Sequence, residues 1–291
     1  FNAVTKSGTN NLHGSVFEFL RNQKLDANRW EANSFGGGRK DAYKRNQFGF
    51  SIGGPVRRDR TFFFGSYEGL REREGETQTF TVPDLRVRQQ GIVPSAAANC
   101  PAAVGSFNAG AGLCTVNVNA GVRPYLLSYP LPNGDLQPSA GTGDWADSRS
   151  VPTNENFFTV RADHKISDKD TLFARYTFDD ATNINRLNFN SYGNNDSRNQ
   201  YAALGETRII SQAVVNQLLL GYTRSVSAQA NTAIDGIDMP TFNFTTHEGA
   251  MGTITTTGLG TWGGDTTFPR ASILNMFQVK DDVFWTAGSH S

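Results

Sequence analysis

The stretch from Arg45 to Arg71 reads RNQFGFSIGGPVRRDRTFFFGSYEGLR, and it predicts two aromatic-rich strands joined by a short basic turn. In its first half, Phe48, Phe50 and Ile52 alternate with small or polar residues. Alternation with a period of two gives a strand one apolar face and one polar face. Soluble antiparallel sheets and membrane β-barrels both use such strands, so this stretch alone leaves both classes open.

The composition of the whole chain favours a barrel. Only 37% of the 291 residues are apolar, yet the chain contains 21 Phe and 30 Gly. A barrel explains this balance, because only alternate strand residues need be apolar and aromatic residues gather at the two membrane interfaces. No run of about 18 apolar residues occurs, which excludes a helical membrane span. The formal net charge is zero, so no nucleic-acid partner is expected.

Eight segments have the character of strands, and most are close to the roughly 9–11 residues that a tilted transmembrane strand needs. We expect the face of Phe48 and Phe50 to meet lipid and the opposite face to meet water. The eight segments are Leu12–Leu20, Gln47–Gly54, Phe62–Arg71, Asn156–Ile166, Thr171–Asp180, Gln200–Ile210, Val214–Arg224 and Asn275–Trp285.

Short and long connections alternate between these segments, as in bacterial outer-membrane barrels with tight periplasmic turns and long extracellular loops. The predicted fold is therefore all-β: an antiparallel transmembrane β-barrel, present as about eight strands of a larger barrel. The short connections are Pro55–Arg60, Ser167–Asp170 and about Ser211–Ala213, and the long ones are Arg21–Asn46, Glu72–Glu155, Ala181–Asn199 and Ser225–Leu274.

Cys100 and Cys114 are the only cysteines, and both lie in a stretch rich in Gly, Ala and Pro. A disulfide that closes this small loop suits an oxidising compartment and would contribute about 3 kcal/mol. Two free thiols are the alternative. Neither cysteine has a second ligand at a spacing typical of a metal site.

Two motifs could suggest chemistry, and neither has the context it needs. Gly49–Gly53 matches the G-x-S-x-G pattern of hydrolases, but Ser51 lies inside an alternating strand and not at a strand-to-helix turn. The glycine-rich stretch Ser34–Lys40 lacks the spacing of a phosphate-binding loop, and we interpret it as a flexible loop.

The remaining polar clusters give no site either. The four histidines are scattered, and the pairs Asp179-Asp180 and Asp281-Asp282 have the positions of solvated or lumen-facing side chains. We therefore expect no enzyme, and we assign no catalytic, cofactor-binding or metal-ligating residue. The histidines are His13, His164, His247 and His290.

Several stretches together resemble the Oar-like branch of the TonB-dependent outer-membrane transporters. The opening residues NAVTKSGTN (2–10) look like the junction between the plug and the barrel of that family. The other matching stretches are HGSVFEFLRN (13–22), the opening hairpin, NENFFTVRADHKISDKDTLFARY (154–176), VVNQLLLGYTRS (214–225) and FQVKDDVFWTAGSHS (277–291).

This resemblance implies a 22-stranded barrel closed by an N-terminal plug, of which the chain is an internal piece. Residues 1–8 would be the end of the plug and its junction, and residues 9–291 the N-terminal portion of the barrel. The protein would reside in the outer membrane, contact its lipid, and take up a ligand with energy from the TonB–ExbB–ExbD complex. The resemblance carries no ligand-binding residue onto this sequence.

The ligand itself stays open among siderophores, oligosaccharides and peptides, and export is not excluded. We expect it to contact aromatic and polar groups of Glu72–Glu155 and Ser225–Leu274. Other hypotheses are a porin or surface adhesin that works without TonB, and a soluble secreted β-sandwich that binds a partner. The aromatic residues of the two loops indicate ordered structure: Phe107, Tyr125, Tyr129, Trp145, Phe242, Phe244 and Trp262.

Overall fold

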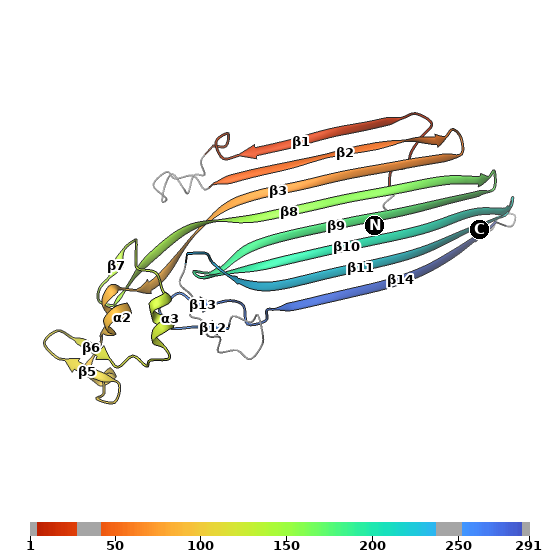
Figure 1. Ribbon diagram of the computed structural model, residues 1–291. Coiled ribbons are helices and arrows are strands. Elements are labelled where there is room, and N and C mark those ends of the chain that lie inside the picture. Colours follow the sequence, from red (N-terminus) through yellow and green to blue (C-terminus); the bar gives the residue numbers. More distant parts are fainter. Residues whose placement is uncertain (1–4, 28–41, 237–251, 287–291) are drawn as a thin grey trace.

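A computed structural model describes residues 5–27, 42–236 and 252–286, in which eight long strands form one antiparallel sheet (Figure 1). Each long strand pairs with its neighbours in the sequence, so the sheet is a simple meander, and the short β7 (Leu136–Gln137) adds to β8. No helix in the described ranges is long and apolar enough to cross a membrane. The long strands are β1 (His13–Asn22), β2 (Tyr43–Arg57), β3 (Thr61–Pro83), β8 (Thr142–Ser167), β9 (Asp170–Asn188), β10 (Ser191–Ser211), β11 (Val214–Ala233) and β14 (Arg270–Trp285).

All eight predicted strands are present, and the three predicted short turns are confirmed. The turns join β2 to β3, β8 to β9 and β10 to β11, and they lie together at the right-hand end of the sheet in Figure 1. Asp59, in the first turn, has a φ of 60°. That turn is further held by the Asn10 side chain, whose Oδ1 accepts a 2.8 Å hydrogen bond from the Asp59 amide.

The strands are longer than predicted at the opposite end. β8 has 26 residues and β3 has 23, against the roughly 9–11 that a membrane crossing needs. The prediction of a long loop at Ala181–Asn199 is wrong, because β9 and β10 run through this range and leave only Phe189 and Asn190 as a tight turn. Hairpin ends with water on both faces do not need apolar alternation, so the pattern that marks a strand is absent there.

The register gives the sheet two chemically different faces. Phe50 pairs with Val16 and Tyr67, and the same face continues across the sheet to Leu204, Leu220 and Val279. Val279 is 76% exposed and Val160, also on this face, is 48% exposed. Apolar side chains that point away from any protein core in a row across a sheet need an apolar solvent. We call this the outer face.

Aromatic rings form a band on the outer face across the middle of the sheet, nearer to the short turns than to the remote ends in β3, β8 and β9. Phe158 lies between the rings of Tyr176 and Phe178, with centroids 6.0 and 5.3 Å away, and Tyr222 lies 4.9 Å from Phe277. Such a girdle is typical of the level where a barrel leaves the membrane. The other members of the band are Phe48, Phe50 and Tyr67.

The opposite face, which we call the lumen face, is polar over most of its length. The Thr159 and Thr177 hydroxyls lie 2.9 Å apart, and the Tyr43 hydroxyl donates a 2.6 Å hydrogen bond to Glu72. Ser225 donates a 2.6 Å hydrogen bond to Asn199. Ladders of this kind between neighbouring strands suit a face that lines water.

Beyond the band of aromatic residues, the extended strands carry a small folded unit that we call the cap. The cap consists of residues 84–141 and 252–268 and the tip of the β9–β10 hairpin (Figure 1). Its core contains five buried side chains, one from the end of β3 and four from three connections: Val82, Tyr125, Tyr129, Phe189 and Trp262. The elements of the cap are α2 (Leu85–Gln90), β4 (Ile92–Pro94), a 3₁₀ turn (Ala97–Asn99), β5 (Gly105–Asn108), β6 (Leu113–Val116), α3 (Arg123–Ser128), β7, β12 (Thr253–Ile254) and β13 (Trp262–Gly263).

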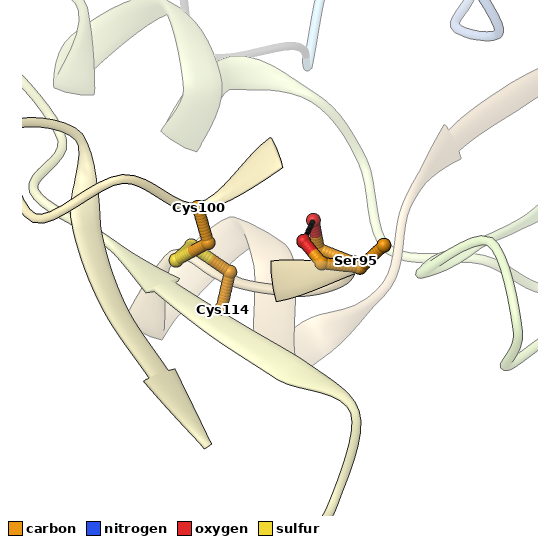
Figure 2. The surroundings of a disulfide bond; sticks show 4 residues. Ser95, Cys100 and Cys114 are labelled. Atoms are coloured by element: carbon orange, nitrogen blue, oxygen red, sulfur yellow. Dashed lines mark hydrogen bonds between the residues drawn. A yellow bond between two sulfur atoms is a disulfide. The ribbon is translucent and has the colours of Figure 1, made fainter. Parts of the chain in front are cut away.

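A disulfide between Cys100 and Cys114 stabilises the outer part of the cap, as Figure 2 shows. The two Cα atoms are 5.8 Å apart, and the bond ties β6 to the segment that precedes β5. The predicted disulfide is therefore confirmed. Because β6 also pairs with β4 and β5, the crosslink stabilises a three-stranded sheet whose strands have only three or four residues.

Candidate functional site

The cap packs on the lumen face of the sheet, at the end remote from the short turns. The uninterrupted register of β3 and β8 places Phe80, Val82 and Trp145 on the same face as Glu68. The ring of Phe189, from the tip of the β9–β10 hairpin, lies 6.3 Å from Phe80 in an edge-on arrangement. Side chains from β3, β8 and the β9–β10 turn therefore form the base of the cap.

Arg186 joins this base to the β9–β10 hairpin. Its guanidinium is fully buried and lies 5.2 Å from the ring centre of Phe80 and 5.6 Å from that of Trp145. It donates hydrogen bonds to the carbonyl of Asp147 at 3.0 Å and to its carboxylate at 3.3 Å. Burial lowers the pKa of Arg186 below its ordinary value, while Asp147 opposes this shift. The pair joins β9 to β8, and the contact of the guanidinium with Phe80 adds β3.

The loop around Trp262 closes the cap from the other side. The Trp262 indole N–H donates a 2.7 Å hydrogen bond to the Ser128 hydroxyl, and its ring meets Tyr125 edge-on at 4.8 Å. Tyr129 stacks on Phe189 at 4.6 Å, and its hydroxyl donates a 2.8 Å hydrogen bond to the Gly260 carbonyl. Burial raises the pKa of Tyr129 to about 12. Three predicted loops thus share one core.

An apolar pocket opens between these segments, with a volume of about 350 Å³. Its walls come from β4, β6, α3 and the segment 254–262. Pockets that take small ligands occupy roughly 300–1,000 Å³ and combine an apolar lining with a few polar groups. The apolar walls are made mainly by Val93, Val116, Val118, Val122, Leu126 and Ile254.

The aromatic residues that the sequence suggested for ligand contact divide into two groups. Tyr125, Tyr129, Trp145 and Trp262 belong to or pack on the cap core, and all of these except Trp145 also line the pocket. Phe107 lies half-buried in β5. Phe242 and Phe244 lie outside the described residues.

The pocket valines and Arg186 were not anticipated from the sequence. Valines spaced irregularly through a Gly- and Asn-rich stretch show no period that would mark a surface, and Arg186 lay in a predicted loop. These residues form a site only because the fold brings together segments that are far apart in the sequence.

The other end of the lumen face carries the N-terminal segment. Arg161, which forms a bidentate ion pair with Asp163 and lies over the ring of Phe173, donates a 2.6 Å hydrogen bond to the Thr5 hydroxyl. Gly8 is buried against the backbone of β2 and β3, where a Cβ would lie 2.7 Å from the Gly54 carbonyl oxygen. A larger residue would not fit without displacing the segment.

The motifs considered for chemistry do not assemble into a site. The Ser51 hydroxyl lies 2.9 Å from the Ser15 hydroxyl within the lumen-face ladder. Each of the pairs Asp179-Asp180 and Asp281-Asp282 divides between the two faces, as neighbours in a strand must.

In residues 5–27, 42–236 and 252–286, no three His, Cys, Asp or Glu side chains are placed to hold a metal ion. Ser34–Lys40, His247 and His290 lie outside the described residues, while His13 and His164 belong to strands that do not pair with each other.

An antiparallel meander with an apolar outer face, an aromatic band and a polar lumen face defines an outer-membrane β-barrel wall. Comparison with known families agrees, since the model of the outer membrane beta barrel domain matches residues 4–291. The chain belongs to this family, and its location is the bacterial outer membrane.

One curated relative is the TonB-dependent transporter Oar of Myxococcus xanthus, which is 33% identical to the chain over 93 residues. The matched stretch covers 31% of this chain and 9% of the transporter. No solved structure matches the chain.

Proposed function

We propose that the chain is part of a TonB-dependent outer-membrane transporter that takes up an extracellular ligand, and not part of an enzyme. The observation that carries this proposal is the occupation of both ends of the lumen face. The cap covers the end remote from the short turns, and residues 5–8 contact the other end through Arg161. A porin needs an open lumen, whereas a gated transporter needs its lumen closed between transport events.

The described sheet is also incomplete. Among the described strands, β1 pairs only with β2 and β14 only with β11, so the sheet has two free edges. An outer-membrane barrel must close on itself, because unpaired strand edges are not tolerated in lipid. We therefore propose that residues 9–291 form the first part of a larger barrel, and that residues 1–8 end a plug domain that precedes it.

In this mechanism, the cap captures the ligand and the plug then moves to open the lumen. Arg161 would release Thr5 during that movement, because the contact ties the segment nearest the plug to the wall. The energy would come from the TonB–ExbB–ExbD complex. Similarity to the Myxococcus transporter over 93 residues supports the Oar-like branch as the place of this protein.

Uptake by intact cells tests the proposal. Cells that produce the full-length protein would be given radiolabelled iron-siderophore complexes, oligosaccharides and peptides, with and without a functional TonB. We expect one class to accumulate only when both the protein and TonB are present. Accumulation without TonB would indicate a porin, and surface binding without accumulation would indicate an adhesin.

A further inference from the structure

The cap pocket is lined without any charged side chain. The lining contains five valines, and its polar side chains besides the tyrosines and Trp262 are Asn117, Asn119 and Thr256. Transfer of a charged group into such a site would forfeit hydration with no ion pair in return, whereas a neutral apolar group would gain by leaving water. The chemistry of the walls therefore selects against charged ligand groups.

The pocket is also accessible and firmly built. Val122, on its rim, is 56% exposed, so the pocket opens to water and is not a sealed packing defect. Its floor is fixed by the Trp262–Ser128 hydrogen bond and by the edge-on contact between Trp262 and Tyr125. One wall belongs to the β4–β6 sheet that the Cys100–Cys114 disulfide constrains. A preformed cavity of this kind binds with little ordering cost.

We propose that this pocket binds a neutral branched aliphatic group of the ligand, of the size of a leucine side chain with its flanking amides. The valines and Leu126 would contact the aliphatic part, and Asn117 and Asn119 supply amide groups to the lining. This inference deepens the proposed uptake function, because it names the chemical class that the cap captures. An uncharged peptide with aliphatic side chains has this chemistry, and a ferric siderophore that carries net charge does not.

Photo-crosslinking of the full-length protein in lipid nanodiscs tests the inference. The probe is N-acetyl-leucine amide with a diazirine in its side chain, and labelled peptides are mapped by mass spectrometry. We expect labelling in residues 116–126 and 253–262 that unlabelled N-acetyl-leucine amide competes away. N-acetyl-leucine with a free carboxylate should compete at least about tenfold less well, because its charge finds no partner in the pocket.

Two variants change the pocket in different ways. Val118→Asp places a charge in the wall, Val118→Phe fills the cavity, and each should reduce cap labelling about tenfold. Val104→Asp is the matched control, since Val104 is an exposed valine of the same cap that does not line the pocket. The near-ultraviolet circular dichroism of the cap aromatics verifies that each variant keeps its core.

Labelling of the lipid-facing strands serves as an internal standard, because an apolar probe also partitions into the membrane. Equal cap labelling in the wild type and both folded Val118 variants would overturn the proposal. So would better competition by the carboxylate than by the amide. Because labelling needs no TonB, a failure here is distinct from a failure of TonB-dependent uptake.

Discussion

The wall and the cap use the same kinds of side chain in opposite ways. In the wall, Leu220 and Val279 point outward and stay exposed, and the polar side chains line the interior. In the cap, Val82 and Phe189 are fully buried. Apolar side chains thus face outward where lipid surrounds the protein and inward where water surrounds it. The aromatic band marks the level at which this preference changes.

The largest expected effect is the loss of stability when a buried ion pair in the cap is removed, compared with removal of an exposed ion pair on the wall. Arg186→Ala should destabilise the cap by about 3–5 kcal/mol, because it removes charge-assisted hydrogen bonds to Asp147 and opens a cavity between the rings of Phe80 and Trp145. Asp147 keeps its ion pair with Arg149 in this variant. Arg198→Ala, which removes a pair with Asp180 that is well exposed, should change the stability little. Limited proteolysis of residues 84–141 measures the effect, and equal protection in both variants would contradict the comparison.

The next largest effect is expected for arginine substitutions of two neighbouring leucines that lie on opposite faces of the wall. Leu219 and Leu220 are 39% and 38% exposed, but the register places Leu220 on the outer face and Leu219 on the lumen face. Leu220→Arg should cost about 2–4 kcal/mol, as expected for a lipid-facing arginine, and Leu219→Arg should be tolerated. Heat-modifiable mobility in gel electrophoresis after refolding into lipid measures both. Equal loss of folded barrel in the two variants would refute the assignment of the faces.

The smallest effect concerns the cap alone, and it depends on pH. The pKa of Tyr129 is raised from 10.0 to about 12 in the folded protein, so its neutral form stabilises the cap fully below pH 10, and this contribution is lost as the pH rises through about 12. Tyr129→Phe should cost about 1 kcal/mol at neutral pH through the lost hydrogen bond to Gly260.

Tyr129→Phe should also make the stability of the cap decrease less steeply as the pH rises through about 12. Tyr125, whose pKa burial also raises, would account for some of the rest. Fluorescence of the cap tryptophans during a pH titration from 8 to 12.5, with the wall mobility as a control, measures this. A wall that melts together with the cap at every pH would show that the two regions do not unfold separately.

The sequence was sufficient to predict the wall because lipid imposes a period of two on every crossing. Phe48, Phe50 and Ile52 reveal their face by alternation, and the short turns fix the direction of the strands. Beyond the membrane this constraint ends. Ala181–Asn199 therefore shows no alternation of apolar and polar residues, although its strands pair, and it was predicted wrongly as a loop. The disulfide could be anticipated because it closes a local loop.

The candidate site could not be predicted because its parts are distant in the sequence. Val116 and Trp262 meet in the pocket across nearly half of the chain, and neither residue carries a local signal of that meeting. Aromatic residues in the loops correctly indicated order, and Tyr129 and Trp262 both belong to the buried core and line the pocket. The period and spacing of residues predict single strands and helices. A cavity between such elements can be located only when their tertiary arrangement is known.

The cap core also has a consequence for the order of assembly. The wall can form hairpin by hairpin, because each strand pairs with the one beside it in the sequence. The core joins Tyr129, Phe189 and Trp262, which lie on three different connections, so its loop-closure entropy must be overcome before any of its contacts form. The cap is therefore the last region to become ordered, and its resistance to protease reports that the strands from β3 to β14 have paired.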